Sequence, residues 1–258
     1  MKKQEKSLSL YVLLFVCMLF LFLFAAGGSV HKLIQQADKQ MPSKPVIVLD
    51  AGHGGEDGGT QGNGLLEKDI NLSIALTLEN LLRANGFEVF MIRSTDTDVA
   101  DHTLTTISER KKSDLKQRAQ WVQEQKNCLL VSIHQNFFEQ TKYHGTQVFY
   151  SVQNESSTQL AQNIQDSVCG LLQPDNEREI KPGEGIYLLD QVQAPAVIVE
   201  CGFLSNADEA ARLNEPLYRQ QMALCIFSGI CDYVESESPA QQTGWFQTEQ
   251  LLSLIQIS

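Results

Sequence analysis

The sequence predicts a single α/β domain with a mostly parallel, twisted sheet flanked by helices, preceded by an N-terminal transmembrane segment. Short apolar runs, typical of buried strands, alternate with longer amphipathic or charged stretches, typical of helices. Glycine and asparagine stand where several of these stretches end. An uncharged apolar run precedes them all. This alternation of strands and helices favours parallel over antiparallel pairing.

The N-terminal run is predicted to be a membrane anchor. Residues 7–30 carry no charge, and residues 10–26 are apolar throughout. At about 1.5 Å per residue, this run and its uncharged flanks span a hydrocarbon core of about 30 Å. A buried core helix is the alternative, but such a helix normally keeps a polar stripe. We therefore assign residues 1–30 to a signal anchor or transmembrane helix.

Cleavage and orientation of this segment follow from its flanks. The small residues at 25–29 offer a signal peptidase site, but the run is longer than a typical signal-peptide core, which favours an uncleaved anchor. Lys2, Lys3 and Lys6 form a short basic N-tail. A signal anchor with such a tail places the following domain outside the cytoplasm.

Composition limits the classes of function. The chain has 258 residues, with 31 acidic against 20 basic side chains and a net charge of −11. Such an acidic chain is a poor binder of nucleic acid or of anionic lipid surfaces. Its length and 43% hydrophobic content suit one globular domain, predicted at residues 46–235. A polar linker at 31–45 precedes it, and a tail at 236–258 either docks on the domain or a membrane or is partly disordered.

The first predicted elements lead into a glycine turn and a helix. The apolar run 46–50 is a buried strand that ends at Gly52-His53-Gly54-Gly55. Residues 70–84 place apolar side chains at helical spacing and stop at Asn85-Gly86, a typical helix end. Residues 87–92 form the next strand.

The remaining elements continue the alternation. Residues 108–125 are highly charged with high helix propensity, and residues 129–133 form a buried strand broken only by Ser132. The other predicted strands are 146–150, which alternates, and 196–199, which is apolar. The other predicted helices are 157–172, which is amphipathic, and 216–234.

The six cysteines do not indicate a disulfide scaffold in a chain of this length. Cys17 lies in the predicted anchor, and no CxxC pair suggests a zinc knuckle. The other five cysteines fall in or beside apolar stretches, and we expect them to be buried free thiols. These are Cys128, Cys169, Cys201, Cys225 and Cys231.

Four residues with metal-binding or acid–base chemistry lie at ends of predicted elements. His53, His134 and Glu200 follow or end three predicted strands, and Glu67 stands at the start of the first helix. Parallel strand ends share one sheet edge, so these side chains can converge there. Two imidazoles and one carboxylate form a zinc set that leaves a position for water, and a further carboxylate can act as general base.

Each of these residues also has a simpler interpretation. A histidine in a glycine turn can be a hydrogen-bonded turn residue, Glu67 can favour the helix dipole, and Glu200 can pair with a lysine. The spacing alone leaves the metal and the simpler interpretations open. His31, His102 and His144 lie in polar loops or turns and are expected to be surface residues.

Four motifs together resemble one known family. Their sequences are VLDAGHGGEDGG at 48–59, EKDINL at 67–72, SIHQN at 132–136 and ECGFLSN at 200–206. In this order they resemble the zinc N-acetylmuramoyl-L-alanine amidases of the type-3 family, from about residue 46 to residue 235. The sequences at 110–118 and 185–188, with the anchor, resemble the germination-specific amidases of the spore cortex.

The resemblance implies a fold, a cofactor and site residues. It implies a sheet of roughly six strands and one catalytic zinc ion, with His53, Glu67 and His134 as ligands and Glu200 as the catalytic glutamate. Gln135 and Phe137 replace small residues of the family pattern, which is expected to reshape the floor of the cleft. The implied partners are peptidoglycan and, through the N-terminal helix, the membrane. An activating protein is a further partner that the resemblance allows.

The implied reaction is hydrolysis of the amide between N-acetylmuramic acid and L-alanine, in spore cortex, where the product feeds formation of muramic-δ-lactam for germination. The alternatives are a general vegetative cell-wall amidase, a non-catalytic peptidoglycan-binding protein of the same fold, and a metallopeptidase that cuts within the stem peptide. A non-catalytic relative is expected to lack Glu200 or a ligand, and all four residues are present here.

Three further charged residues have two interpretations each. Asp50 and Asp57 either orient a metal-binding histidine or stabilise the glycine turn. Arg118 either binds a peptide carboxylate or lies on a solvated helix face, which we slightly prefer.

Overall fold

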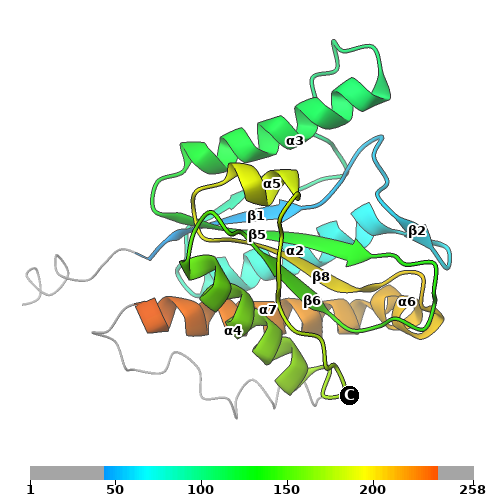
Figure 1. Cartoon of the computed structure of the whole chain (residues 1–258), viewed down its shortest axis with the longest axis vertical. Coiled ribbons are helices and arrows are strands. Elements are labelled where there is room, and N and C mark those ends of the chain that lie inside the picture. The colour runs from blue at the N-terminus through cyan, green and yellow to red at the C-terminus, as the bar shows by residue number, and fades with distance from the viewer. Residues whose placement is uncertain (1–43, 238–258) are drawn as a thin grey trace, which may run out of the picture. The chain divides into compact units, whose positions relative to one another are not determined.

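A six-stranded sheet lies at the centre of the part of the chain that the computed structural model describes, residues 44–237 (Figure 1). Its strands are β1 (Val46–Ala51), β4 (Val89–Met91), β5 (Cys128–Asn136), β6 (Gln147–Tyr150), β7 (Lys181–Pro182) and β8 (Ala196–Phe203). A small hairpin of β2 (Gln61–Gly62) and β3 (Leu65–Leu66) is separate from this sheet. The helices are α2 (Glu67–Ala84), α3 (Ile107–Glu124), α4 (Ser156–Leu171), α5 (Tyr187–Gln191), α6 (Ala207–Asn214) and α7 (Pro216–Glu237).

The strand order is β4-β1-β5-β8-β6-β7. All neighbouring pairs are parallel except β6 and β8, which are antiparallel. The predicted α/β class and the mostly parallel, six-stranded sheet are therefore confirmed. The parallel strands β1, β5 and β8 lie side by side, so their carboxyl ends meet at one edge of the sheet.

Helices cover both faces of the sheet. One face packs on α2, α4 and α7, and the other packs on α3 and α5 (Figure 1). Strand β5 shows the alternation that this requires, because Val131 and Ile133 belong to the larger core while Leu130 belongs to the smaller one. Ser132 and His134 share the face of Leu130, and so both point towards the side that carries α3 and α5.

The long elements lie where the sequence predicts them, and several short ones were missed. The hairpin β2–β3, strand β7 and helices α5 and α6 were not predicted, because two to eight residues are too few to show a period. Helix α7 extends to Glu237, three residues beyond the predicted end.

Two strands also run past their predicted ends. The prediction ended the third strand at His134 and the last at Glu200, whereas β5 continues to Asn136 and β8 to Phe203. A bulge follows the pairing of His134 with Glu200, and Asn136 then pairs with Phe203. The strand ends were predicted too early because the alternation of apolar and polar residues in the sequence does not reveal backbone pairing beyond a bulge.

The predicted signal anchor at residues 1–30, with Cys17, and the linker residue His31 lie outside the described residues. So do residues 31–43 of the linker and residues 238–258 of the tail. Within residues 44–237, none of the helices has the length and apolar character needed to cross a membrane. Cys128, Cys201 and Cys225 are buried as expected, while Cys169 and Cys231 are partly exposed, and all five are free thiols.

Candidate functional site

His53 stands in a tight turn directly after β1. The backbone groups of Gly54 and Asp57 hydrogen-bond each other across this turn, at 2.9 and 3.0 Å, and His53 adopts a positive φ of 62°. Its Nδ1 lies 2.9 Å from Oδ2 of Asp57. An ionised Asp57 accepts the Nδ1 proton and so fixes the orientation of the ring, whose Nε2 lies 3.3 Å from Oε1 of Glu67. Asp57 thus combines the two roles considered for it, because it closes the turn and orients the histidine.

Glu67 is the first residue of α2 and is buried, with 3% of its surface exposed. Its Oε1 accepts hydrogen bonds from the backbone N–H of Gln135, at 3.0 Å, and from Asn71, at 3.3 Å. Its Oε2 accepts the backbone N–H of Thr60, at 2.8 Å. Burial alone would raise the pKa of this carboxyl, but hydrogen bonds to His134 and His53 outweigh burial and lower it. Glu67 is therefore a fixed carboxylate rather than a surface helix-dipole residue.

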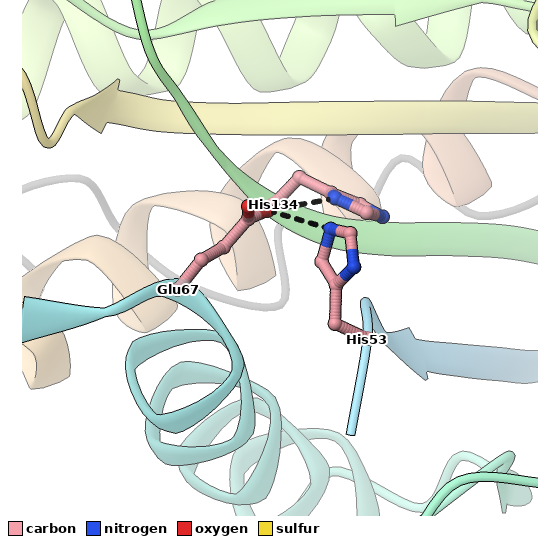
Figure 2. A group of neighbouring side chains, drawn as sticks. All are labelled: His53, Glu67 and His134. Carbon is pink, nitrogen blue, oxygen red and sulfur yellow. Dashed lines mark hydrogen bonds and ion pairs between the residues drawn. The ribbon is translucent and has the colours of Figure 1, made fainter. Parts of the chain in front are cut away.

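His134 completes a cluster with His53 and Glu67. Its Nδ1 lies 2.9 Å from Oε1 of Glu67, and its ring stands edge-on to that of His53, at 5.0 Å between centroids. One ligand atom from each of the three residues lies within 4.8 Å of the others. Figure 2 shows both imidazoles pointing at the same carboxylate. The three predicted ligands, which are far apart in sequence, thus come together.

The cluster is so tight that only glycine fits at two neighbouring positions. A Cβ atom at Gly52 would lie 2.3 Å from the His134 ring. A Cβ atom at Gly59, where φ is +66°, would lie 2.6 Å from Oε2 of Glu67 and 2.7 Å from the His53 ring. Glycine therefore allows the backbone to approach the cluster closely.

Glu200 lies on β8 directly beside His134 and points to the same face of the sheet. Its Oε2 is buried and has no hydrogen-bond partner within residues 44–237. Burial raises the pKa of Glu200 to about 7, against the opposing effect of His134. A buried, unpaired carboxylate is costly, so it indicates a group kept for chemistry rather than for stability. The simpler interpretation offered a pairing with a lysine, and in the described part of the chain no lysine forms an ion pair with Glu200.

Arg118 does not have either of its predicted roles. It is 2% exposed, and it pairs with Asp50 below it and with Asp114 on its own helix. Its Nη2 donates to the backbone oxygen of His53, at 2.8 Å. Asp50 also accepts a hydrogen bond from Ser132, at 2.6 Å. Arg118 and Asp50 are therefore an internal support for the turn, because the carboxylates of a helix and a strand neutralise the buried guanidinium.

Sequence analysis did not identify Arg93, which supports the turn from the other side. Its side chain, 3% exposed, donates to the backbone oxygens of Ala51, at 2.7 Å, and of Gly52, at 3.1 Å. It also donates to the oxygen of Lys68, at 2.8 Å. Its position immediately after a predicted strand, at the same sheet edge as His53, was a signal that could have revealed it.

Gln135 does not reshape the cleft floor as expected. It is 3% exposed and points away from the cleft, because it alternates with His134, and it donates to Asn71 behind Glu67, at 3.1 Å. Phe137 lies beyond β5 and is 45% exposed. His102 and His144 are exposed and lie outside the cluster, as predicted.

A cleft with about 350 Å³ of space leads to the cluster. His53 and His134 line its floor, and helices α3 and α5 form its walls, which also lie over one face of the sheet in Figure 1. Lys111 and Leu115 come from α3, and Tyr187 comes from α5. A concave site with convergent polar groups at strand ends is where α/β proteins bind ligands.

Comparisons with known proteins point to one enzyme family. Residues 47–232 match the family described as N-acetylmuramoyl-L-alanine amidase. The chain belongs to this amidase family. It is therefore a cell-wall amidase, an enzyme that hydrolyses peptidoglycan, and the resemblance to the type-3 members is confirmed.

Relatives of this amidase include a germination enzyme. The germination-specific N-acetylmuramoyl-L-alanine amidase of Bacillus subtilis is 37% identical over 238 residues, which cover 90% of this chain and 96% of that protein. The structure of the CwlD amidase from Clostridioides difficile, in complex with the GerS lipoprotein, is 37% identical with a TM-score of 0.72 and covers 74% of this chain and 99% of that one. The catalytic domain of CwlV from Bacillus (Paenibacillus) polymyxa is 30% identical with a TM-score of 0.61, covering 74% and 98%.

Proposed function

We propose that this amidase is zinc-dependent and cleaves the amide between the lactyl group of N-acetylmuramic acid and L-alanine. One observation carries this proposal. The carboxylate of Glu200, whose Oε2 is buried without a hydrogen-bond partner among residues 44–237, lies beside a compact group of two imidazoles and one carboxylate. A structural site would be closed by a fourth ligand, whereas three ligands beside an unused base suit hydrolysis.

The donor set fits zinc. His53, Glu67 and His134 offer nitrogen and oxygen atoms within 4.8 Å of one another, and Asp57 fixes the tautomer of His53. A bound zinc ion would lower the pKa of a coordinated water towards about 7 and polarise the scissile carbonyl. The buried arginines Arg93 and Arg118 hold the backbone of residues 51–53 from two sides, and so they keep His53 in place.

Glu200 acts as general base and then as general acid. Its Oε2 has no hydrogen-bond partner among residues 44–237, so this oxygen is free to accept a proton from the attacking water. It then donates this proton to the departing amine of L-alanine. Its position on β8, opposite His134, keeps it on the cleft side of the sheet.

We further propose that the substrate is spore-cortex peptidoglycan, where the stripped muramic acid feeds formation of muramic-δ-lactam. The likeness to a germination-specific amidase supports this role. The likeness to an amidase in complex with a lipoprotein supports a protein partner at the membrane surface. The predicted signal anchor suits the same location, with the catalytic domain outside the cytoplasm.

Product analysis tests this proposal. The zinc-loaded protein is incubated with isolated cortex and with vegetative peptidoglycan, and the products are identified by mass spectrometry. We expect intact stem peptides that begin with L-alanine, released faster from cortex. Cleavage within the stem peptide would contradict the amidase and indicate a metallopeptidase. Equal release from both walls would reduce the claim to a general cell-wall amidase.

A further inference from the structure

Arg178 is a half-buried arginine whose guanidinium is held in a fixed orientation. Its Nε donates to the backbone oxygen of His144, at 2.6 Å, and its Nη1 donates to the side-chain oxygen of Gln147, at 3.0 Å. The guanidinium also lies over the ring of Phe203, 4.6 Å from the centroid. These contacts use two of the five N–H donors of the guanidinium, and the other three have no hydrogen bond to residues 44–237.

No carboxylate of residues 44–237 forms an ion pair with this guanidinium. The ion pairs found within residues 44–237 engage other cations, and none includes Arg178. In a chain with a net charge of −11, a fixed guanidinium without an acidic partner is unexpected. A planar guanidinium with free N–H groups matches the geometry of a carboxylate.

The sheet places Arg178 near the proposed catalytic base. Gln147, which accepts the hydrogen bond from Arg178, is the register partner of Glu200 on the neighbouring strand. Residues directly opposite in an antiparallel pair point to the same face. The guanidinium therefore lies on the face that carries Glu200 and His134, about one strand further along the sheet.

This spacing corresponds to a short piece of extended peptide. Neighbouring strands lie about 4.8 Å apart, and the hydrogen bond that Arg178 donates to Gln147 adds 3.0 Å. An extended chain advances about 3.3–3.6 Å per residue. A group on the second residue after the cleaved amide therefore spans the distance from Glu200 to Arg178.

We propose that Arg178 is a specificity-determining residue that binds the free carboxylate on the second residue of the stem peptide. This inference rests on the proposed amidase function, because it takes the cleaved amide to lie at Glu200. The contacts to His144, Gln147 and Phe203 orient the guanidinium in advance, so little side-chain entropy is lost on binding.

The test measures recognition separately from catalysis. The probes are N-acetylmuramoyl-L-alanyl-D-glutamic acid and its α-amide, which differ in one carboxylate. Their affinities for the zinc-loaded Glu200→Gln protein, which is not expected to cleave them, are measured by isothermal titration calorimetry. We expect the acid to bind at least about tenfold more tightly than the amide, as a charge-assisted hydrogen bond predicts.

Variants assign this preference to Arg178. Arg178→Gln in the same background should bring the ratio of the two affinities close to one. The matched control is Lys142→Gln, which removes an exposed positive charge beside Tyr143, 5.4 Å from its ring, and should keep the preference. If Arg178→Gln does not fold, Arg178→Lys replaces it in the test. Lysine keeps the positive charge but lacks the paired N–H donors of the guanidinium, so this variant should retain only part of the preference.

The outcomes separate the two proposals. Equal affinity for acid and amide in the Glu200→Gln protein, or an unchanged ratio when Arg178→Gln is added to it, would overturn the role of Arg178. Cleavage of the same two probes is measured with the unmutated Glu200 protein. A preference for the acid without any cleavage would support the role of Arg178 and contradict the amidase proposal.

Discussion

His134 and Glu200 are register partners on the neighbouring parallel strands β5 and β8, and both side chains point to the face beneath α3 and α5. This pairing holds a candidate metal ligand and a candidate base side by side. The imidazole of His134 reaches Glu67, while the carboxylate of Glu200 remains unpaired within the described residues. A ligand group and a base are therefore fixed by two adjacent strands rather than by loops, which suits precise positioning.

Replacing His53, Glu67 or His134 by alanine should remove metal and activity together. A three-ligand site that loses one ligand holds zinc weakly. Metal content by mass spectrometry and release of stem peptides measure both effects. Alanine at His102 or His144, which lie outside the cluster, should leave both unchanged. A loss of metal in these control variants but not in the ligand variants would show that the assigned set is wrong.

Replacing Asp57 by asparagine should weaken zinc binding about 10- to 100-fold, the usual effect of removing the partner of a ligating histidine. The asparagine keeps the size of the side chain, but it no longer favours the Nδ1–H tautomer of His53 with a negative charge. Competition with a chelator measures the affinity. Asp96→Asn is the control, because Asp96 bonds the same turn at Gly55 without touching His53. Equal affinities in both variants would argue against this role.

Replacing Gly52 by alanine should displace the His134 ring, because the new Cβ would lie 2.3 Å from it. We expect loss of zinc and of activity. Gly170→Ala, in helix α4 with open space around the new Cβ, should retain both. It should also raise the free energy of unfolding by about 0.5–1 kcal/mol, as glycine-to-alanine changes in helices do. Full zinc content in Gly52→Ala would contradict the close approach.

The buried pair of Asp50 and Arg118 should make stability depend on acid pH. Burial alone would raise the pKa of Asp50, but Arg118 outweighs burial and holds it below the ordinary value of 3.8. The stabilisation is therefore complete above about pH 4 and is lost as the pH falls towards the lower pKa of the folded state. Urea unfolding between pH 7 and pH 3 measures this loss.

Asp50→Asn tests the same pair directly. It leaves the Arg118 guanidinium with one fewer carboxylate and should cost about 3–5 kcal/mol at pH 7, the usual effect of breaking a buried pair. The difference from the parent protein should shrink as the pH falls below 4. A difference that stays constant from pH 7 to pH 3 would show that the charge of Asp50 does not matter.

The sequence predicted the main elements and placed His53, Glu67, His134 and Glu200 near one sheet edge, where the structure also brings them together. The reason is physical, since buried parallel strands are apolar runs and their ends carry the polar residues, as at His53 and Glu200. The role of Arg118 could not be predicted, because α3 is charged along its length and buries few side chains. Which charged residue of such a helix turns inward depends on Asp50, which belongs to a distant strand.

The cleft was not predictable in detail for a similar reason. Its wall α5 has five residues, too few for a helical period. Arg178, outside the residues that line the cleft, is likewise held by groups from two distant segments, residues 144–147 and β8. Contacts of this kind depend on tertiary packing rather than on local pattern.

The most direct test of the account is zinc content and peptide release measured together in the parent protein and in Glu200→Gln. Glu88→Gln, an exposed site at the start of β4, serves as the matched control. We expect zinc in all three proteins, with release of stem peptides beginning with L-alanine lowered at least about 10²-fold in Glu200→Gln alone, because the amide cannot accept the proton of water. Parent-like release by Glu200→Gln, or a parent protein that cleaves this bond with no metal bound, would contradict the account.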